Sequence, residues 1–333
     1  MKIKNNVSLR DKHTFHCECY ADTFIEIDEE GDLIQLDRNF PEIYQKAFFI
    51  GEGSDILITK NSLPLVIHCN INFIEIVEED LNNVILCAGG GTKWDDLVDF
   101  CVNKNWWGVE NLSGIPSSCA VAPIQNIGAY GAEFAGVAYK IYGYNFKTHK
   151  FVIYTPNDLS FGYRKSKLQQ MPEIFITKIE ILLNKNAKPN LSYKDLKNKF
   201  QDTNPSLQEI RNTVLEIRDN KIPQPDKIGN AGSFFKNPIC TKKELEILTK
   251  KFPDICFFQY LDDKYKISAA WLIEKAGWKG YREGDAGVSP THSLILVNYG
   301  NATGQDILNL ANKIIDSVKN IFDIKLEPEV KIL

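Results

Sequence analysis

The 333-residue sequence lacks the features that define several broad functional classes. Its formal net charge is -4, so it has no basic excess with which to neutralise a nucleic-acid backbone. No apolar run approaches the roughly 20 residues that a membrane helix requires. The first residues, MKIKNN, lack the apolar core of a signal peptide. We therefore expect a cytoplasmic protein with no membrane span and no nucleic-acid partner.

Metal-binding and dinucleotide-binding motifs are also missing. The eight cysteines lie mostly singly in apolar stretches, as Cys87 and Cys101 do, which favours buried, reduced thiols. His16–Cys19 (HCEC) has no second Cys/His pair at ligand spacing, and strand-like alternation explains it equally well, so we expect no metal site. Gly89–Gly91 lacks the full GxGxxG fingerprint, and we assign it no nucleotide role.

What the sequence does contain is a mixture of strand and helix patterns, in a chain long enough for about two or three domains. Apolar runs predict strands at 48–50, 56–58, 63–67, 84–88, 141–144, 151–154, 174–177 and 293–297. Helical spacing predicts helices at 94–102, 206–219, 242–251, 268–276 and 304–321. Thr92 is the expected N-cap of the first of these helices. The predicted fold class is α+β, in about three domains.

The most informative segment is Asn230–Pro238 (NAGSFFKNP). Gly232 and Ser233 allow the backbone to come close to a ligand. Phe234 and Phe235 could exclude water, so that the Ser233 hydroxyl delivers a proton rather than exchanging it with solvent. An ordinary turn with two core aromatics explains the same residues.

Other segments have the composition of ligand-binding loops. Gly51–Asp55 and Ser113–Ser118 could each aim backbone N–H groups at a diphosphate, although each is also typical of a plain turn. Gln125–Glu133 offers amides and small residues suited to the edge of an isoalloxazine ring. Arg164 follows an aromatic pair and could clamp a carboxylate or an enolate with two hydrogen bonds. Taken by itself, Glu329 is typical of a surface carboxylate that is exposed to solvent.

Taken in order along the chain, these segments resemble the UDP-N-acetylenolpyruvoylglucosamine reductase (MurB) family, type I. Pro189–Leu196, which contains Tyr193, resembles the tyrosine loop of that type. The matching runs are GEGS at 51–54, ENL at 110–112, IP at 115–116, APIQNIGAYG at 122–131, FGYR at 161–164, NAGSFFKNP at 230–238 and LEPEV at 326–330.

The resemblance implies a fold, two cofactors and a reaction. It implies two FAD-binding domains of the vanillyl-alcohol-oxidase (PCMH) type, at residues 1–67 and 68–213, and an α+β substrate-binding domain at 214–326. Residues 327–333 would return to the first domain as a strand. NADPH would reduce a non-covalent FAD, and UDP-N-acetylglucosamine enolpyruvate would then be reduced at the same site to UDP-N-acetylmuramate, a peptidoglycan precursor. We expect a monomer.

The resemblance also assigns site residues. Hydride addition at C3 pushes negative charge through C2 into the substrate carboxylate, which Arg164 would stabilise while Ser233 protonates C2 and Glu329 polarises or protonates the carboxylate. The predicted cofactor-binding residues are Gly51, Glu52, Gly53, Ser54, Asp55, Ser113, Gly114, Ile115, Pro116, Ser117, Ser118, Gln125, Asn126, Gly128, Ala129, Tyr130 and Gly131. The predicted substrate-binding residues are Tyr163, Tyr193, Lys221, Asn237, Lys279 and His292, with no metal ligand.

The chain departs from the family pattern at several positions, and two other functions stay open. Asp55 stands where relatives have Asn, Lys165 where Asp is usual, and the chain stops at Leu333, shortly after Glu329. One alternative is an FAD-dependent sugar or alcohol oxidase of the same flavin fold, for which His68 or Cys119 are conceivable covalent tethers. The other is a flavin-binding protein without catalysis.

Overall fold

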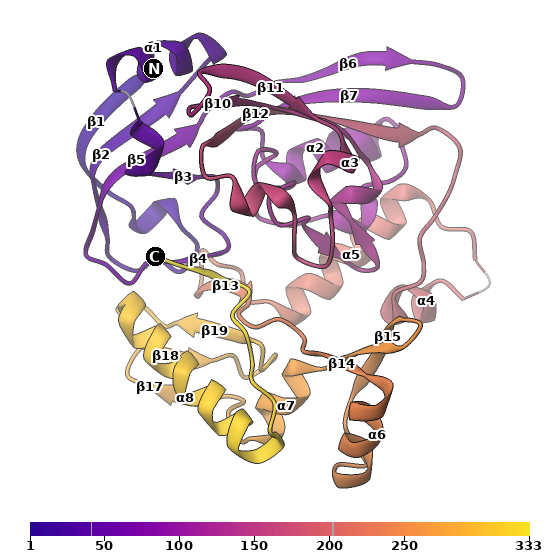
Figure 1. The fold of residues 1–333 in the computed structure, drawn as a ribbon. Coiled ribbons are helices and arrows are strands. Elements are labelled where there is room, and N and C mark those ends of the chain that lie inside the picture. The colour runs from indigo at the N-terminus through magenta and orange to yellow at the C-terminus, as the bar shows by residue number, and fades with distance from the viewer. Residues whose placement is uncertain (41, 202) are drawn as a thin grey trace. The chain divides into compact units, whose positions relative to one another are not determined.

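The computed structural model describes residues 1–40, 42–201 and 203–333, which form two compact units (Figure 1). Unit 1 comprises residues 1–7, 21–52 and 63–218, and unit 2 comprises 8–20, 53–62 and 219–333. Both units combine helices with sheets, which confirms the α+β class. The proposed domain boundaries at residues 67 and 213 stay a prediction.

Unit 1 is built on two sheets. The first has the order β1-β2-β5-β3 and the second the order β11-β10-β12-β7-β6. The second is antiparallel throughout, and its central strand β12 is buried at eight of its eleven positions, on both faces of the sheet. The strands are β1 (Lys2–Ser8), β2 (Tyr20–Ile27), β3 (Ala47–Ile50), β5 (Ser62–Cys69), β6 (Ile74–Glu79), β7 (Asn83–Gly89), β10 (Ala138–Asn145), β11 (Lys150–Tyr154) and β12 (Ile174–Asn184). A short hairpin joins β8 (Gly128–Ala129) to β9 (Ala132–Glu133).

Helix α2 (Trp94–Asn103) fills the core of unit 1 beneath this second sheet. Its buried residues Trp94, Leu97, Val98, Cys101 and Val102 follow helical spacing, which is why the sequence predicted it. The predicted N-cap was wrong, because the hydroxyl of residue 92 donates to the Phe73 carbonyl oxygen at 3.1 Å and residue 93 occupies the cap position. The other helices of unit 1 are α1 (Glu30–Asn39), α3 (Pro156–Leu159), α4 (Lys194–Lys199) and α5 (Leu207–Lys221).

Unit 2 has a four-stranded sheet, β13-β19-β18-β17, a three-stranded sheet, β14-β16-β15, and a parallel pair, β20-β4. Helix α8 (Gly304–Phe322) buries one apolar face in the core of this unit. The strands are β4 (Ile56–Leu57), β13 (Gly229–Ser233), β14 (Ile239–Thr241), β15 (Phe257–Leu261), β16 (Lys264–Ile267), β17 (Arg282–Glu283), β18 (Ala286–Val288), β19 (Ile295–Asn298) and β20 (Lys331–Ile332). The other helices are α6 (Lys242–Lys251) and α7 (Ala269–Lys275). Short 3-10 helices lie at η1 (Arg10–Lys12), η2 (Ile43–Gln45), η3 (Glu110–Leu112), η4 (Phe134–Gly136) and η5 (Lys167–Gln170).

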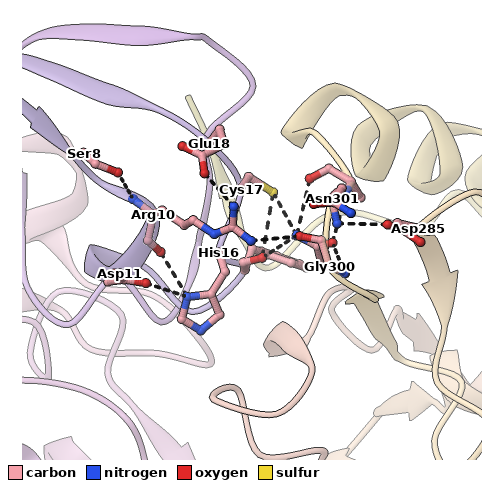
Figure 2. Close-up of polar contacts among 12 residues, drawn as sticks. Ser8, Arg10, Asp11, His16, Cys17, Glu18, Asp285, Gly300 and Asn301 are labelled. Carbon is pink, nitrogen blue, oxygen red and sulfur yellow. Dashed lines mark hydrogen bonds and ion pairs between the residues drawn. The ribbon is translucent and has the colours of Figure 1, made fainter.

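Residues 8–20, although close to the N-terminus, are anchored within unit 2. Figure 2 shows Arg10 between Glu18 and Gly300, with its guanidinium donating to the Glu18 carboxylate at 2.6 Å and to the Gly300 carbonyl at 3.2 Å. The buried Asn298 amide donates to the Phe15 carbonyl oxygen at 2.9 Å. These bonds join segments almost 300 residues apart in the chain, so no local pattern could have predicted them.

Six of the eight cysteines are buried, as the sequence predicted, and none forms a disulfide. In the HCEC segment Cys17 and Cys19 are buried while Glu18 is exposed, and burial raises the pKa of the Cys17 thiol to about 12. Across residues 1–40, 42–201 and 203–333, no group of histidine, cysteine and carboxylate side chains is suited to hold a metal ion. The alternation therefore serves packing.

Candidate active site

Ser233 ends strand β13 next to a bulge in its pairing with β19. Gly232 has φ +68°, a conformation that side chains rarely adopt, so glycine is required to make this turn. The buried Asn230 side chain accepts the Gly232 N–H at 3.0 Å and donates to two further carbonyl groups. Phe234 and Phe235 lie fully in the core of unit 2, so they anchor the segment while Ser233 stays half-buried.

The C-terminal segment brings Glu329 beside this strand. The Glu329 N–H donates to the Phe234 carbonyl at 2.8 Å, and the Lys236 N–H donates to the Glu327 carbonyl at 2.9 Å. Ser233 and Glu329 therefore stand on adjacent backbone segments of one unit. Two predicted catalytic residues that are almost 100 positions apart in the sequence are brought together in this way.

The same C-terminal segment also bonds to residues next to and within the predicted loop Gly51–Asp55, which we call the first glycine loop. The Lys331 N–H donates to the Asp55 carbonyl at 3.0 Å, and β20 pairs in parallel with β4. The Thr59 N–H and hydroxyl both donate to the Leu333 carbonyl, at 2.9 and 2.6 Å. Backbone hydrogen bonds on both sides of Glu329 therefore hold this residue in place.

Three predicted substrate-binding residues gather elsewhere in unit 2. The pKa of His292 is lowered mainly by burial and further by the positive charges of Lys221 and Lys279. Lys279 pairs with both carboxylate oxygens of Glu274 at 3.1 Å. Lys221 and Lys279 thus act on one half-buried imidazole, with the Glu274 carboxylate beside them, and lysines suit a diphosphate as point charges. The Asn237 side chain also has a structural contact, since its oxygen accepts a hydrogen bond from the Ala269 N–H at 2.9 Å.

In unit 1, the loop carrying Arg164 is fastened to the predicted flavin-binding segment. The Arg164 guanidinium donates to the Gly128 carbonyl at 2.7 Å, and its charge lies 5.5 Å from the centre of the Tyr163 ring. The buried Asn126 amide donates to the Gly162 carbonyl at 3.0 Å and to the Glu133 carboxylate at 2.8 Å, and its oxygen accepts the N–H of residue 135. Asn126 therefore holds the two segments together, and a contact from it to a cofactor would come from its backbone.

An ion pair supports the predicted loop Ser113–Ser118, which we call the second glycine loop. Arg211 of α5 donates two hydrogen bonds to Asp95 of α2, at 2.7 and 2.9 Å, and Asp95 accepts the Gly114 N–H at 2.6 Å. The Ser117 N–H donates to the Ile115 carbonyl at 2.8 Å. Two of the N–H groups that the sequence assigned to a diphosphate are therefore used within the protein, which leaves fewer donors than a full nest would have.

Replacing Asp95 with Asn should lower stability at neutral pH by about 1–2 kcal/mol, since a charged pair becomes a neutral contact that is partly open to water. Burial raises the pKa of Asp95, but hydrogen bonds from Arg211 and Gly114 outweigh it, so the net pKa is lowered. A lowered carboxylate pKa gives stability that is present above the unfolded value of 3.8 and is lost as pH falls through the folded value.

Thermal unfolding of the unmodified protein and of Asp95→Asn, measured between pH 7 and pH 3, would test this expected loss of stability. The difference between their midpoints should be largest near pH 7 and should shrink below about pH 4. A difference that is independent of pH would show that the Asp95 charge contributes nothing. Asp96→Asn, one position along the same helix, is the matched control.

Gly51 lies against the segment around Ser118 within unit 1. A Cβ atom at Gly51 would lie 2.7 Å from the Ser118 hydroxyl and 2.5 Å from a Val121 methyl, so only glycine allows this approach. The Ser118 hydroxyl oxygen is buried and has no hydrogen-bond partner among the residues that the structure describes. A buried hydroxyl of this kind fits an acceptor brought by a ligand, such as a phosphate or flavin oxygen. The donor set is thus compatible with FAD.

The tyrosine loop lies against the segment 128–131. The rings of Tyr130 and Tyr193 meet edge to face, with centroids 5.0 Å apart. Asn111, which the sequence placed in a matching run without giving it a role, donates to the Tyr130 carbonyl at 2.7 Å. Its place inside the matched run ENL was the signal that the sequence offered.

Cys119 and His68, the two residues considered as covalent flavin tethers, both pack within the protein. Cys119 is fully buried, and burial raises the pKa of its thiol well above the usual value, so little thiolate forms. The His68 ring stacks on Phe24, and its Nδ1 lies 3.2 Å from the Ile50 carbonyl oxygen. Neither residue has the setting of an activated nucleophile.

The predicted residues divide between the two units. Unit 2 holds Gly53, Ser54, Asp55, Lys221, Ser233, Asn237, Lys279, His292 and Glu329. Unit 1 holds Gly51, Glu52, Ser113, Gly114, Ile115, Pro116, Ser117, Ser118, Gln125, Asn126, Gly128, Ala129, Tyr130, Gly131, Tyr163, Arg164 and Tyr193. No helix in the described ranges has both the length and the apolar character needed to cross a bilayer.

Comparisons with known proteins agree along the whole chain. Residues 22–142 match an FAD binding domain family, and residues 224–333 match the UDP-N-acetylenolpyruvoylglucosamine reductase C-terminal domain. A UDP-N-acetylenolpyruvoylglucosamine reductase of Flavobacterium johnsoniae is 39% identical, with all of both chains covered. One of Xylella fastidiosa is 35% identical over 98% of this chain and 95% of its own. The crystal structure of UDP-N-acetylenolpyruvylglucosamine reductase from Thermus caldophilus superposes with a TM-score of 0.70 at 25% identity, covering 100% of this chain and 99% of that one.

Proposed function

This chain belongs to the family of UDP-N-acetylenolpyruvoylglucosamine reductases, and from that membership we propose that it reduces UDP-N-acetylglucosamine enolpyruvate to UDP-N-acetylmuramate, a peptidoglycan precursor. FAD is its non-covalent cofactor and NADPH its reductant. The full-length match to the Flavobacterium johnsoniae protein carries the proposal. The adjacent placement of Ser233 and Glu329 supports it from the structure.

Backbone and hydroxyl groups of the predicted loops would hold FAD. Gly51 provides a close backbone approach, and the Ser118 hydroxyl supplies a buried donor for a cofactor oxygen. Segment 125–131 keeps its shape because Asn126 and Arg164 fasten it to the loop at 161–166. Bound FAD would supply the redox chemistry, with NADPH as the source of the hydride that C3 of the enolpyruvyl group receives.

The residues of this chain manage the charge and the proton. Arg164 stabilises the negative charge that moves through C2 into the substrate carboxylate, and preorganised stabilisation of this kind is worth about 3 kcal/mol. Ser233 gives a proton to C2, which completes the addition of hydride and proton across the double bond. Glu329, fixed by its backbone bond to Phe234, assists at the substrate carboxylate.

Charged and aromatic groups bind the sugar nucleotide. Lys221 and Lys279 act as point charges on the diphosphate, beside His292. For Lys279 this requires the pair with Glu274 to open. Tyr163, Tyr193 and Asn237 complete the substrate site. NADPH uses the same site before the sugar nucleotide does.

We also propose that the enzyme works as a monomer in the cytoplasm. Its eight cysteines form no disulfide, which suits a reducing compartment. Light scattering on the purified holoenzyme would determine its mass, and a mass twice the 37.9 kDa of one chain would exclude the monomer.

An anaerobic stopped-flow titration tests the function directly. NADPH is added first and UDP-N-acetylglucosamine enolpyruvate second, while the visible absorbance of the flavin is followed. Bleaching followed by recovery is the expected result. Bleaching without recovery would overturn the substrate assignment and leave an FAD-dependent oxidase. A purified protein without flavin colour would point to a protein that has lost the cofactor site.

A further inference from the structure

We propose that Asn111 is a positioning residue that ties the tyrosine loop, residues 189–196, to the turn at Tyr130 and Gly131, and so sets the place of Tyr193 for the sugar nucleotide. The inference rests on the proposed function. It concerns a residue to which the sequence motifs assigned no role.

The first observation is the use of the Asn111 amide. Asn111 is 1% exposed and lies in the short helix η3. Its nitrogen donates to the Tyr130 carbonyl at 2.7 Å and to the Asn190 carbonyl at 2.8 Å. An amide nitrogen carries two hydrogens, so both are used. One buried amide therefore fixes two carbonyl groups. They lie 19 and 79 residues along the chain from Asn111, and so 60 residues from each other.

The second observation is a parallel set of bonds on the loop itself. The Asn190 side chain donates to the Gly131 carbonyl at 2.9 Å and accepts from the Ser192 hydroxyl at 2.7 Å. Tyr193 then packs edge to face on Tyr130 and begins helix α4 as its N-cap residue. The loop and the turn are thus joined at Asn190 and again at Tyr193.

The third observation is the backbone of the turn. Tyr130 has φ +51°, an uncommon conformation for a bulky residue, which persists only where the surroundings impose it. The hydrogen bond from Asn111 to its carbonyl and the contact with Tyr193 are such constraints. Loosening Asn111 should therefore relax both the turn and the loop.

Two variants separate this role from a general effect on folding. Asn111→Asp keeps the shape of the side chain but removes both donors. Asn190→Ala removes the parallel bonds of a half-buried residue and leaves the Asn111 contacts in place. Asn186→Ala, an exposed amide in the same connection, is the matched control.

Hydrogen exchange of the apoprotein is the first measurement. In both variants we expect the amides of residues 128–131 and 189–199 to exchange about tenfold faster, whereas those of α2 stay unchanged. Unchanged exchange at 189–199 in both variants would overturn the tie, whatever the enzyme's substrate is.

Steady-state kinetics is the second measurement. In both variants we expect KM for UDP-N-acetylglucosamine enolpyruvate to rise about tenfold with kcat within a factor of two, as removal of a positioning contact predicts. In a Tyr193→Ala background the same changes should have no further effect on KM, because the role acts through that ring. Fully additive effects, or an unchanged KM, would overturn the inference. Failure of the unmodified protein to oxidise its reduced flavin with this substrate would instead overturn the proposed function.

Discussion

Replacing Ser233 with Ala should lower the rate of flavin reoxidation by substrate about a thousandfold, while NADPH still bleaches the flavin at its normal rate. The first half-reaction needs no proton at C2, whereas the second cannot finish without one. The substitution removes only a hydroxyl from a half-buried position whose backbone is fixed by Asn230, Gly232 and the pairing with β19. Stopped-flow absorbance, with the two half-reactions measured separately, gives both rates.

Ser233→Cys is the matched variant, since a thiol of similar size keeps a transferable proton. Partial recovery of the second half-reaction is expected for it. Equal loss of both half-reactions in Ser233→Ala would contradict the proton-donor role and would point to damage to the segment. The flavin content of each purified variant checks that the cofactor site survives.

Replacing Glu329 with Gln should reduce turnover about a hundredfold with little change in stability. The backbone bonds that hold this position, from Glu329 to Phe234 and from Lys331 to Asp55, do not involve the changed side chain. The variant therefore changes only the charge at a position whose backbone stays fixed. We expect its thermal unfolding midpoint to lie within about 1 °C of that of the unmodified protein, as for surface substitutions.

Glu327→Gln is the control, since it changes an exposed carboxylate two positions earlier on the same segment. It should retain full activity. Near-normal turnover in Glu329→Gln would remove this residue from the proposed chemistry, although the segment would still be an anchor for the strand of Ser233.

Local patterns predicted most of the helices of unit 2 and the core strands of unit 1. The helices at 242–251, 268–276 and 304–321 agree with α6, α7 and α8 to within one residue at either end. The strand predicted at 293–297 begins two residues later, because the Ile295 N–H donates to the His292 carbonyl oxygen at 3.0 Å and closes a turn there. The strands at residues 2–8 and 20–27 were not predicted, since their pattern is interrupted by polar residues at exposed positions.

The site was predicted as a set of motifs but not as an arrangement. The family resemblance and the FAD cofactor are confirmed by the comparisons. The individual roles of Ser233, Arg164 and Glu329 stay predictions. Asn126 was predicted to bind the cofactor, and in the structure its side-chain amide joins two loops. A motif identifies which residues matter, and only packing distinguishes a residue that meets a ligand from one that holds its neighbour.

The sequence by itself determined the chemistry available and the order in which it occurs. A hydroxyl after a glycine, a guanidinium after an aromatic pair and a carboxylate near the end are properties of single residues and their immediate neighbours. The tertiary structure decided which of these segments meet. Glu329 lies beside the Ser233 strand, residues 8–20 join unit 2, and Asn111 ties two distant loops. These contacts depend on backbone hydrogen bonds between segments far apart in the chain, and such bonds follow from how the whole core packs rather than from local spacing.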